Sequence, residues 1–178
     1  SVNSFFHNSV YIGGVNSGVS NSSSFWRNST TGNVQVVNNL FHNYRSGTGS
    51  HYAIVNLTGT SWSTTASDYN NLSTSNTSTL GMWPFWPLNS DKSFAAWKAI
   101  SGGDMQSINT PVVFVNNEND LHLTYDNCDH VNRGVPSSIT TDIDGEARNN
   151  TTPDIGADEL ISAGIFYFAD SDNDNYGS

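Results

Sequence analysis

The sequence predicts an all-β protein in which short parallel strands wind into a coil, and three observations support this. A seven-residue phrase occurs twice, at residues 2–8 (VNSFFHN) and 37–43 (VNNLFHN), with looser copies at 22–28 (SSSFWRN) and 68–71 (DYNN). Short apolar runs alternate with corners rich in Gly, Ser and Asn over the first 80 residues. That region shows no helical periodicity. A short strand that recurs at unequal intervals is typical of stacked structural repeats.

The repeat also predicts which way its side chains point. Each copy ends in an aromatic residue, a polar residue and Asn, at residues 6–8, 26–28 and 41–43. Since side chains alternate faces along a strand, we expect the aromatic inside the coil and the polar residue on a solvated outer face. The polar residues could instead form a column that binds an anionic sugar. The terminal Asn residues are expected to stack at a corner, because Asn tolerates tight turns and its amides can hydrogen-bond along a stack.

The remaining elements follow from local signals. Residues 93–100 (SFAAWKAI) predict one short helix, with Ser93 or Asp91 as its N-cap and Gly102 at its end. Strands are expected at residues 10–12, 34–37, 52–57, 112–115 and 121–124.

Residues 81–90 (GMWPFWPLNS) are expected to form a loop fixed by two prolines. It carries three aromatic residues, Trp83, Phe85 and Trp86, which could contact a glycan by stacking on sugar rings. The alternative is that this loop packs against the end or side of the coil.

Composition narrows the function. The chain of 178 residues has the length of one domain and a net charge of −10, and no Asp or Glu precedes Asp68. Its six Lys and Arg residues form no cluster, which argues against a nucleic-acid partner. No apolar run reaches membrane-spanning length and no signal peptide is visible, so we expect a piece of a longer exported protein. The single cysteine, Cys128, is expected to be a small buried apolar residue.

The segment 141–159 (TDIDGEARNNTTPDIGADE) gathers acids around one arginine, Arg148. Five of the six acids in this segment are assigned to the group around Arg148, namely Asp142, Asp144, Asp154, Asp158 and Glu159. In one interpretation they form a structural cap, in which Arg148 makes a forked salt bridge and holds the tail across an open end of the coil. In the other, several of the acids bind Ca²⁺.

Together with residues 67–72 (SDYNNL), 103–108 (GDMQSI) and 120–123 (DLHL), this segment resembles the C-terminal end of right-handed parallel β-helix exoproteins. Such proteins are common on bacterial surfaces, notably among those exported by the type IX secretion route. The resemblance covers roughly residues 60–160 and departs from the family at residues 84–87 and 129–134. It implies a right-handed parallel β-helix solenoid over residues 1–160, with one short helix and a C-terminal cap. It implies no reaction.

The last residues resemble the opening of a thrombospondin type 3-like calcium repeat, which makes residues 161–178 a separate acidic linker. Carboxylates at alternate positions are typical of the first half of an EF-hand loop. The expected Ca²⁺ ligands are Asp170, Asp172, Asp174, Asn175 and Tyr176. The alternative is an acidic tail without an ion.

These observations favour a non-enzymatic, adhesin-like structural module of a larger secreted bacterial protein, located outside the cell or on its surface. Its expected partners are preceding β-helix rungs or another chain at the N-terminal end, and a glycan or cell-surface ligand. The alternatives are the tail of a polysaccharide lyase or glycosidase, and a glycan-binding module. An enzyme is disfavoured because residues 1–67 contain no carboxylate for a glycosidase, and Arg27 and Arg45 have no neighbouring acids for a lyase site.

Overall fold

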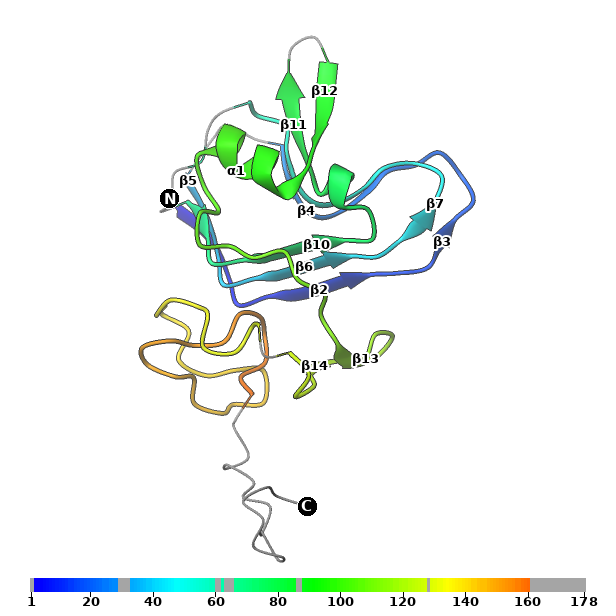
Figure 1. Ribbon diagram of the computed structural model, residues 1–178. Helices are drawn as coiled ribbons and strands as arrows, with labels where there is room; N and C mark the ends of the chain where they lie inside the picture. The colour runs from blue at the N-terminus through cyan, green and yellow to red at the C-terminus, as the bar shows by residue number, and fades with distance from the viewer. Residues whose placement is uncertain are drawn as a thin grey trace, which may run out of the picture.

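The computed structural model of the chain describes residues 2–28, 33–59, 62, 66–85, 88–127 and 129–160. Its described part consists of short β-strands and one α-helix, α1 (Phe94–Ser101), with a single 3-10 turn at Thr77–Thr79 (Figure 1). The predicted all-β class is therefore confirmed.

The chain passes through the same set of sheets three times. The first pass contributes β1 (Val2–Phe6), β2 (Ser9–Ile12), β3 (Val15–Asn16) and β4 (Ser22–Arg27). The second contributes β5 (Asn33–Val37), β6 (Leu40–Asn43), β7 (Ser46–Gly47) and β8 (His51–Asn56). The third contributes β9 (Ser67–Asp68), β10 (Asn71–Thr74) and β11 (Gly81–Phe85).

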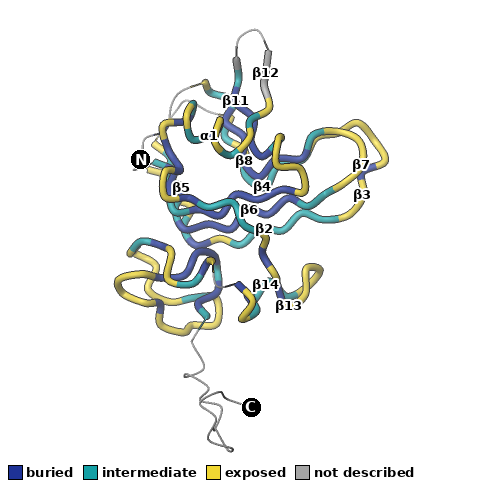
Figure 2. The backbone as a smooth tube through the Cα atoms, in the orientation of Figure 1, coloured by how far each residue is buried: buried dark blue, intermediate teal, exposed yellow. Residues whose placement is uncertain are grey.

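Corresponding strands of successive passes pair in parallel. They form the sheets β1-β5-β9, β2-β6-β10, β4-β8-β11 and the two-stranded β3-β7. In Figure 1 the strands β2, β6 and β10 lie one above another. The middle strands β6 and β8 are buried along their whole length, whereas β7 is exposed (Figure 2).

The register of these passes differs from the repeat seen in the sequence. The matching phrases lie 35 positions apart in the sequence, whereas the corner residues Asn8, Asn39 and Asn70 bond one another at steps of 31. Phe6 accordingly pairs with Val37 rather than with a second aromatic residue. The two segments have similar sequences but lie on different elements. Residues 2–6 of the first segment form β1, whereas residues 40–43 of the second segment form β6.

The corner itself has a shared backbone conformation. His7, Asn38 and Tyr69 occupy equivalent positions and all have positive φ, at 52°, 60° and 55°. Asn is the residue type that tolerates this conformation best after glycine. The repeat unit is therefore the corner and the strand that follows it.

Stacked asparagine amides are present at the corner, as predicted, but with partly different members. The backbone N–H of Asn8 donates to Asn39 Oδ1 at 2.9 Å, and the N–H of Asn39 donates to Asn70 Oδ1 at 2.9 Å. The side chains also bond in series, from Asn8 Nδ2 to Asn39 Oδ1 at 2.8 Å and from Asn39 Nδ2 to Asn70 Oδ1 at 3.0 Å. Asn28 and Asn43, which were expected in the stack, lie elsewhere on the chain.

The expected solvated column of His7, Arg27 and His42 is wrong. His7 and His42 are buried, and Arg27 places its guanidinium 5.3 Å from the ring centre of Trp62. On β4 it is Phe25 that faces the core, where it stacks on Phe41 at 5.3 Å between ring centres. His42 does lie on the outer face of β6, but a later segment of the chain covers it.

The predicted helix is confirmed with its caps. The Ser93 hydroxyl accepts the Ala96 N–H, and Gly102 ends α1 in the left-handed conformation. Trp97 is fully buried and donates its indole N–H to Asp104 at 2.8 Å. In Figure 1, α1 lies beyond β10, on the side of the sheet opposite β2.

The expected proline loop at residues 81–90 is instead part of a hairpin. β11 pairs antiparallel with β12 (Leu88–Lys92), from Gly81 opposite Lys92 to Phe85 opposite Leu88. Pro84 is tolerated on β11 because only Gly81 and Met82 of this strand also pair with β8.

A second apolar cluster covers the outer face of the sheet β2-β6-β10, here called the middle sheet. β13 (Phe114–Asn116) and β14 (Asp120–Leu123) form an antiparallel pair. Buried residues of this region and of the irregular segment 129–160 pack on β6, and the cluster comprises Leu40, Val112, Phe114, Leu123 and Ile155. His42 meets Phe114 edge-on at 6.1 Å, which explains its burial.

Candidate functional site

The C-terminal segment, residues 129–160, lies along the asparagine corner. Asn38 and Val135 exchange two hydrogen bonds, at 2.7 and 3.0 Å, and Gly156 N–H donates to the Asn38 carbonyl at 2.9 Å. Ala157 N–H donates to Ser9 Oγ at 2.9 Å, and Asn71 contacts His130 at 2.6 Å. The segment thus touches all three passes from the side, and these contacts do not place it across an end of the stack.

Arg148 holds this segment together internally. Its buried guanidinium pairs with Glu159 Oε2 at 3.1 Å through one nitrogen. Its other donors go to the carbonyls of Thr141, Gly156 and Ala157 at 3.2, 3.1 and 2.6 Å. These bonds offset the cost of burying the charge, and removal of either ionic partner would leave the other charge buried without compensation.

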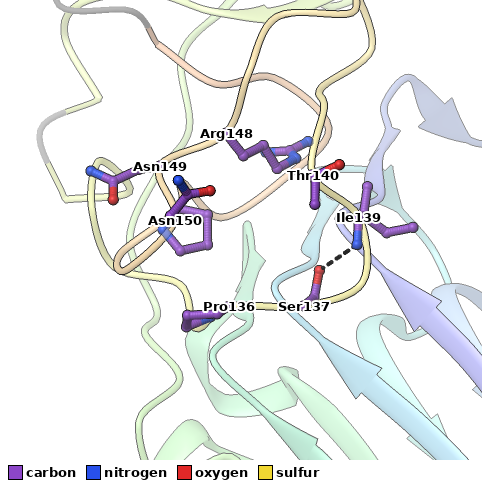
Figure 3. A pocket seen from close by; sticks show the side chains of 8 residues that line it. Pro136, Ser137, Ile139, Thr140, Arg148, Asn149 and Asn150 are labelled. Carbon is purple, nitrogen blue, oxygen red and sulfur yellow. Dashed lines mark hydrogen bonds between the residues drawn. The ribbon is translucent and has the colours of Figure 1, made fainter.

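The hollow beside Arg148 is too small for an organic ligand. Figure 3 shows Arg148 near Thr140 and Ile139, with Asn149 and Asn150 across the opening. Its volume is about 40 Å³. Sites for small molecules usually measure about 300–1,000 Å³, so this hollow suits a few water molecules.

The acids expected around Arg148 lie in different parts of the C-terminal segment. Asp154 faces the inside of the segment, where its carboxylate accepts the Asn132 N–H at 2.6 Å and the Leu160 N–H at 2.8 Å. Burial raises the pKa of Asp154 to about 6. Asp142 closes a turn by accepting the backbone N–H groups of Asp144 and Glu146, at 2.9 and 2.8 Å.

The other two acids, Asp144 and Asp158, meet a histidine instead. Asp144 Oδ2 lies 2.8 Å from His122 Nε2, and the second ring nitrogen, Nδ1, lies 2.5 Å from Asp120 Oδ1. His122, Asp144 and Asp158 each offer one ligand atom, and these atoms all lie within 4.8 Å of one another. This His122 cluster joins β14, the turn at residues 142–145 and the end of the C-terminal segment.

Charge in the His122 cluster is unbalanced. Asp158 is 6% exposed, and its Oδ2 accepts the Leu123 N–H at 2.7 Å. Burial raises the pKa of Asp158, and the neighbouring Asp142 and Asp144 add to this effect. The hydrogen bond to Asp120, together with Asp144, raises the pKa of His122 to about 8. The arrangement therefore favours a positive charge at this place, either a protonated His122 or a cation bound beside it.

Sequence reasoning did not select His122 or Asp120. One signal was available, because Asp120 and His122 are two apart and would share a face of one strand. The expected strand at residues 121–124 began one residue too late to include Asp120, whereas the observed β14 contains both residues. No such signal connected them to Asp144 and Asp158, which lie far along the chain in an irregular segment.

The residues expected to contact a glycan are placed only in part. Trp83 is 4% exposed and packs edge-on against Trp97 at 5.5 Å, so its ring is part of the core and is not available to a sugar. The side chain of Phe85 and all of Trp86 lie outside the described residues. The same holds for Cys128 and for the expected Ca²⁺ ligands Asp170, Asp172, Asp174, Asn175 and Tyr176.

Among the described residues, no strand pairs with the outer edge of the first pass. β1, β2 and β4 are the outermost strands of their sheets at this end. A groove of about 340 Å³ runs between β1 and β4, and Phe5 and Trp26 in its lining are 41% and 48% exposed. A second hollow of about 410 Å³ lies beside residues 6–10, and Ile139 and Ile143 of the C-terminal segment border it.

Comparisons of the chain with protein-family models, with curated proteins and with solved structures found no match. Within the described part of the chain, no helix has the length and apolar character needed to cross a membrane.

Proposed function

We propose that the chain forms the last turns of a right-handed parallel β-helix and serves as a non-enzymatic structural module of a secreted or surface-exposed bacterial protein. In this proposal the three passes are rungs, and further rungs of the same polypeptide stack on β1, β2 and β4. The observation that carries the proposal is the difference between the two ends of the stack.

At the end formed by the third pass, other parts of the chain cover the strands. Trp97 of α1 packs into the core cluster above the third pass, and β12 pairs with β11. Asn71 at the start of β10 forms a parallel bridge with Ile108 of the following segment. The chain itself therefore covers this end of the stack.

At the end formed by the first pass, no described residue pairs with the strand edges, and part of the core is exposed. Parallel sheets are normally buried, and an exposed edge is a template for another strand. Phe5 meets Phe25 edge-on at 5.2 Å, so the aromatic stack of the interior runs out to the open end. A rung with the same register would cover Phe5 and fill the groove between β1 and β4.

A duplication of the first pass tests this proposal. Residues 2–32 span one repeat, because Val2 pairs with Asn33. A chain in which residues 2–32 occur twice in tandem should add one rung. Hydrogen–deuterium exchange should then show new protection of the β2 and β4 amides, and the melting temperature should rise. The matched control carries the same 31 inserted residues in scrambled order.

If the duplicated and scrambled chains show equal protection and equal melting temperatures, the first-pass edge does not accept a rung and the proposal is wrong. The absence of catalysis is checked separately with a panel of neutral and acidic polysaccharides. Release of reducing ends or of unsaturated uronates by the purified chain would contradict a purely structural role.

The acidic residues after 160 belong to the same proposal as a calcium-dependent linker. Alternate carboxylates at Asp170, Asp172 and Asp174 suit Ca²⁺, which prefers oxygen ligands. Calorimetric titration should show Ca²⁺ binding that is lost when these three residues are changed to Asn. Binding that survives this change would place the ion elsewhere.

A further inference from the structure

The His122 cluster has the geometry of a metal site with an oriented histidine. Nδ1 of His122 is held by Asp120, which leaves Nε2 directed toward Asp144 at 2.8 Å. In protein metal sites the ring nitrogen that does not bind the ion is commonly held by a carboxylate, which fixes the ring and its tautomer. Asp120 is placed to act as such a positioning residue.

The donor atoms are close enough for small movements to bring them around one ion: His122 Nε2 and Asp144 Oδ2 are 2.8 Å apart, and Asp158 offers an oxygen within 4.8 Å of the other ligand atoms. Zinc lies about 2.0–2.2 Å from nitrogen and oxygen ligands, so tetrahedral ligand atoms are about 3.3 Å apart. The His122–Asp144 separation of 2.8 Å would open by about half an ångström around an ion of this kind. Asp144 can make this adjustment because its side chain is 54% exposed.

Electrostatics also favours a cation here. Asp144 and Asp158 approach one another within 4.8 Å, and Asp158 is buried. In the part of the chain that the structure describes, the ion pairs at this cluster are the two made by His122. Arg148, an arginine of the same segment, is engaged with Glu159. A divalent ion would balance both carboxylates at once.

The donor set indicates the class of ion. Ca²⁺ and Mg²⁺ prefer ligand sets made of oxygen atoms. A neutral imidazole with two carboxylates suits zinc and neighbouring first-row metals. This site is thus distinct in chemistry from the calcium linker expected after residue 160.

We propose that His122, Asp144 and Asp158 bind one divalent transition-metal ion of the zinc class. The ion ties β14 to the C-terminal segment and so fastens that segment to the outer face of the middle sheet. This inference is independent of the β-helix proposal, since it depends only on contacts within residues 120–158.

The test is titration of Zn²⁺, Co²⁺ and Ca²⁺ into chelator-treated full chain, by calorimetry and by the visible absorption of Co²⁺. The expected result is one Zn²⁺ or Co²⁺ per chain, tetrahedral Co²⁺ bands, and a higher melting temperature with Zn²⁺. His122→Ala and Asp144→Asn should each weaken Zn²⁺ binding at least tenfold. The matched control is Asp126→Asn, which removes an exposed acid in the loop after β14.

Asp144→Asn serves as the second variant because its side chain is exposed, so we expect the apo variant to fold as the unchanged chain does. Circular dichroism of each apo variant checks this. Zn²⁺ binding that is absent, or that both variants leave unchanged, would overturn the proposal. Binding of Ca²⁺ that depends on Asp144 but not on His122 would also overturn it, because the histidine would then not be a ligand.

Discussion

The asparagine stack should contribute measurably to stability, and Asn39 is its central member. Asn39 is fully buried, and its Oδ1 accepts from both the backbone and the side chain of Asn8. Its Nδ2 donates to the carbonyls of Phe5 and Val37 and to Asn70 Oδ1. Asn39→Ala removes all of these bonds and leaves the backbone of the corner in place.

The expected loss follows from the partners left behind. One net hydrogen bond contributes about 1 kcal/mol, and a buried group left without a partner costs about 1–3 kcal/mol. Asn70 Oδ1 keeps its bond to the Asn39 N–H, whereas the Asn8 N–H loses its acceptor. Because the Asn8 side is near the open edge and reaches water, we expect a total loss of about 3 kcal/mol for Asn39→Ala.

The matched control is Asn8→Ala at the exposed end of the stack, which should cost less than about 1 kcal/mol. Equilibrium unfolding in urea, with the m-value compared between variants, measures both changes. A loss of about 3 kcal/mol corresponds to a fall of about 6–12 °C in melting temperature for a chain of this size. If Asn39→Ala costs under about 1 kcal/mol, or no more than Asn8→Ala, the stack has no special role in stability.

Three further changes test the C-terminal segment and the corner. Gly156→Ala should lower the free energy of unfolding by about 2–4 kcal/mol, because φ is +111° and the added Cβ would lie 2.6 Å from Leu40 Cδ1. Gly145→Ala is the control and should cost less, because the space around its Cβ is open. Arg148→Met should cost about 3–5 kcal/mol by leaving Glu159 buried without its partner, and adding Glu159→Gln should recover part of this loss in a double-mutant cycle. Burial, with a smaller effect of Arg148, lowers the pKa of His7 from 6.5 to about 4, so its contribution to stability is present above pH 6.5 and is lost as pH falls toward 4. His7→Asn, which suits the positive φ, should reduce the acid-induced loss by about 3 kcal/mol in unfolding measured between pH 7 and 4, and an unchanged pH profile would contradict the assigned pKa.

Some elements could be predicted from the sequence because local interactions determine them. The helix at residues 94–101 was recognisable because its cap residues, Ser93 and Gly102, act on backbone groups within four residues of them. The all-β class and the stacking of asparagine amides followed from residue types that favour strands and corners. The helix and its caps depend on neighbours in the chain, so the sequence predicts them with their residues, whereas the stack joins residues 31 apart and the sequence predicted its existence but not all of its members.

Strand register was beyond the sequence alone. The phrases ending in Asn8 and Asn43 are alike in letters, yet Asn8 stacks on Asn39. Similar short sequences can form a strand in one pass and a corner in the next, and only the pairing of the backbone distinguishes the two cases. The same limit applies to the expected loop at residues 81–90, where pairing with residues of β12 makes a hairpin.

The sequence by itself determined the strand-rich class, the helix at residues 94–101, the residue types at the corners and the acidic character of the C-terminal half. The tertiary structure alone decided that His42 is buried under Phe114 and that His122 meets Asp144 and Asp158. The physical reason is that burial and ion pairing depend on segments 22 to 72 residues apart, which the packing of an irregular segment on the outer face of a sheet brings together. No local pattern of residues carries that information.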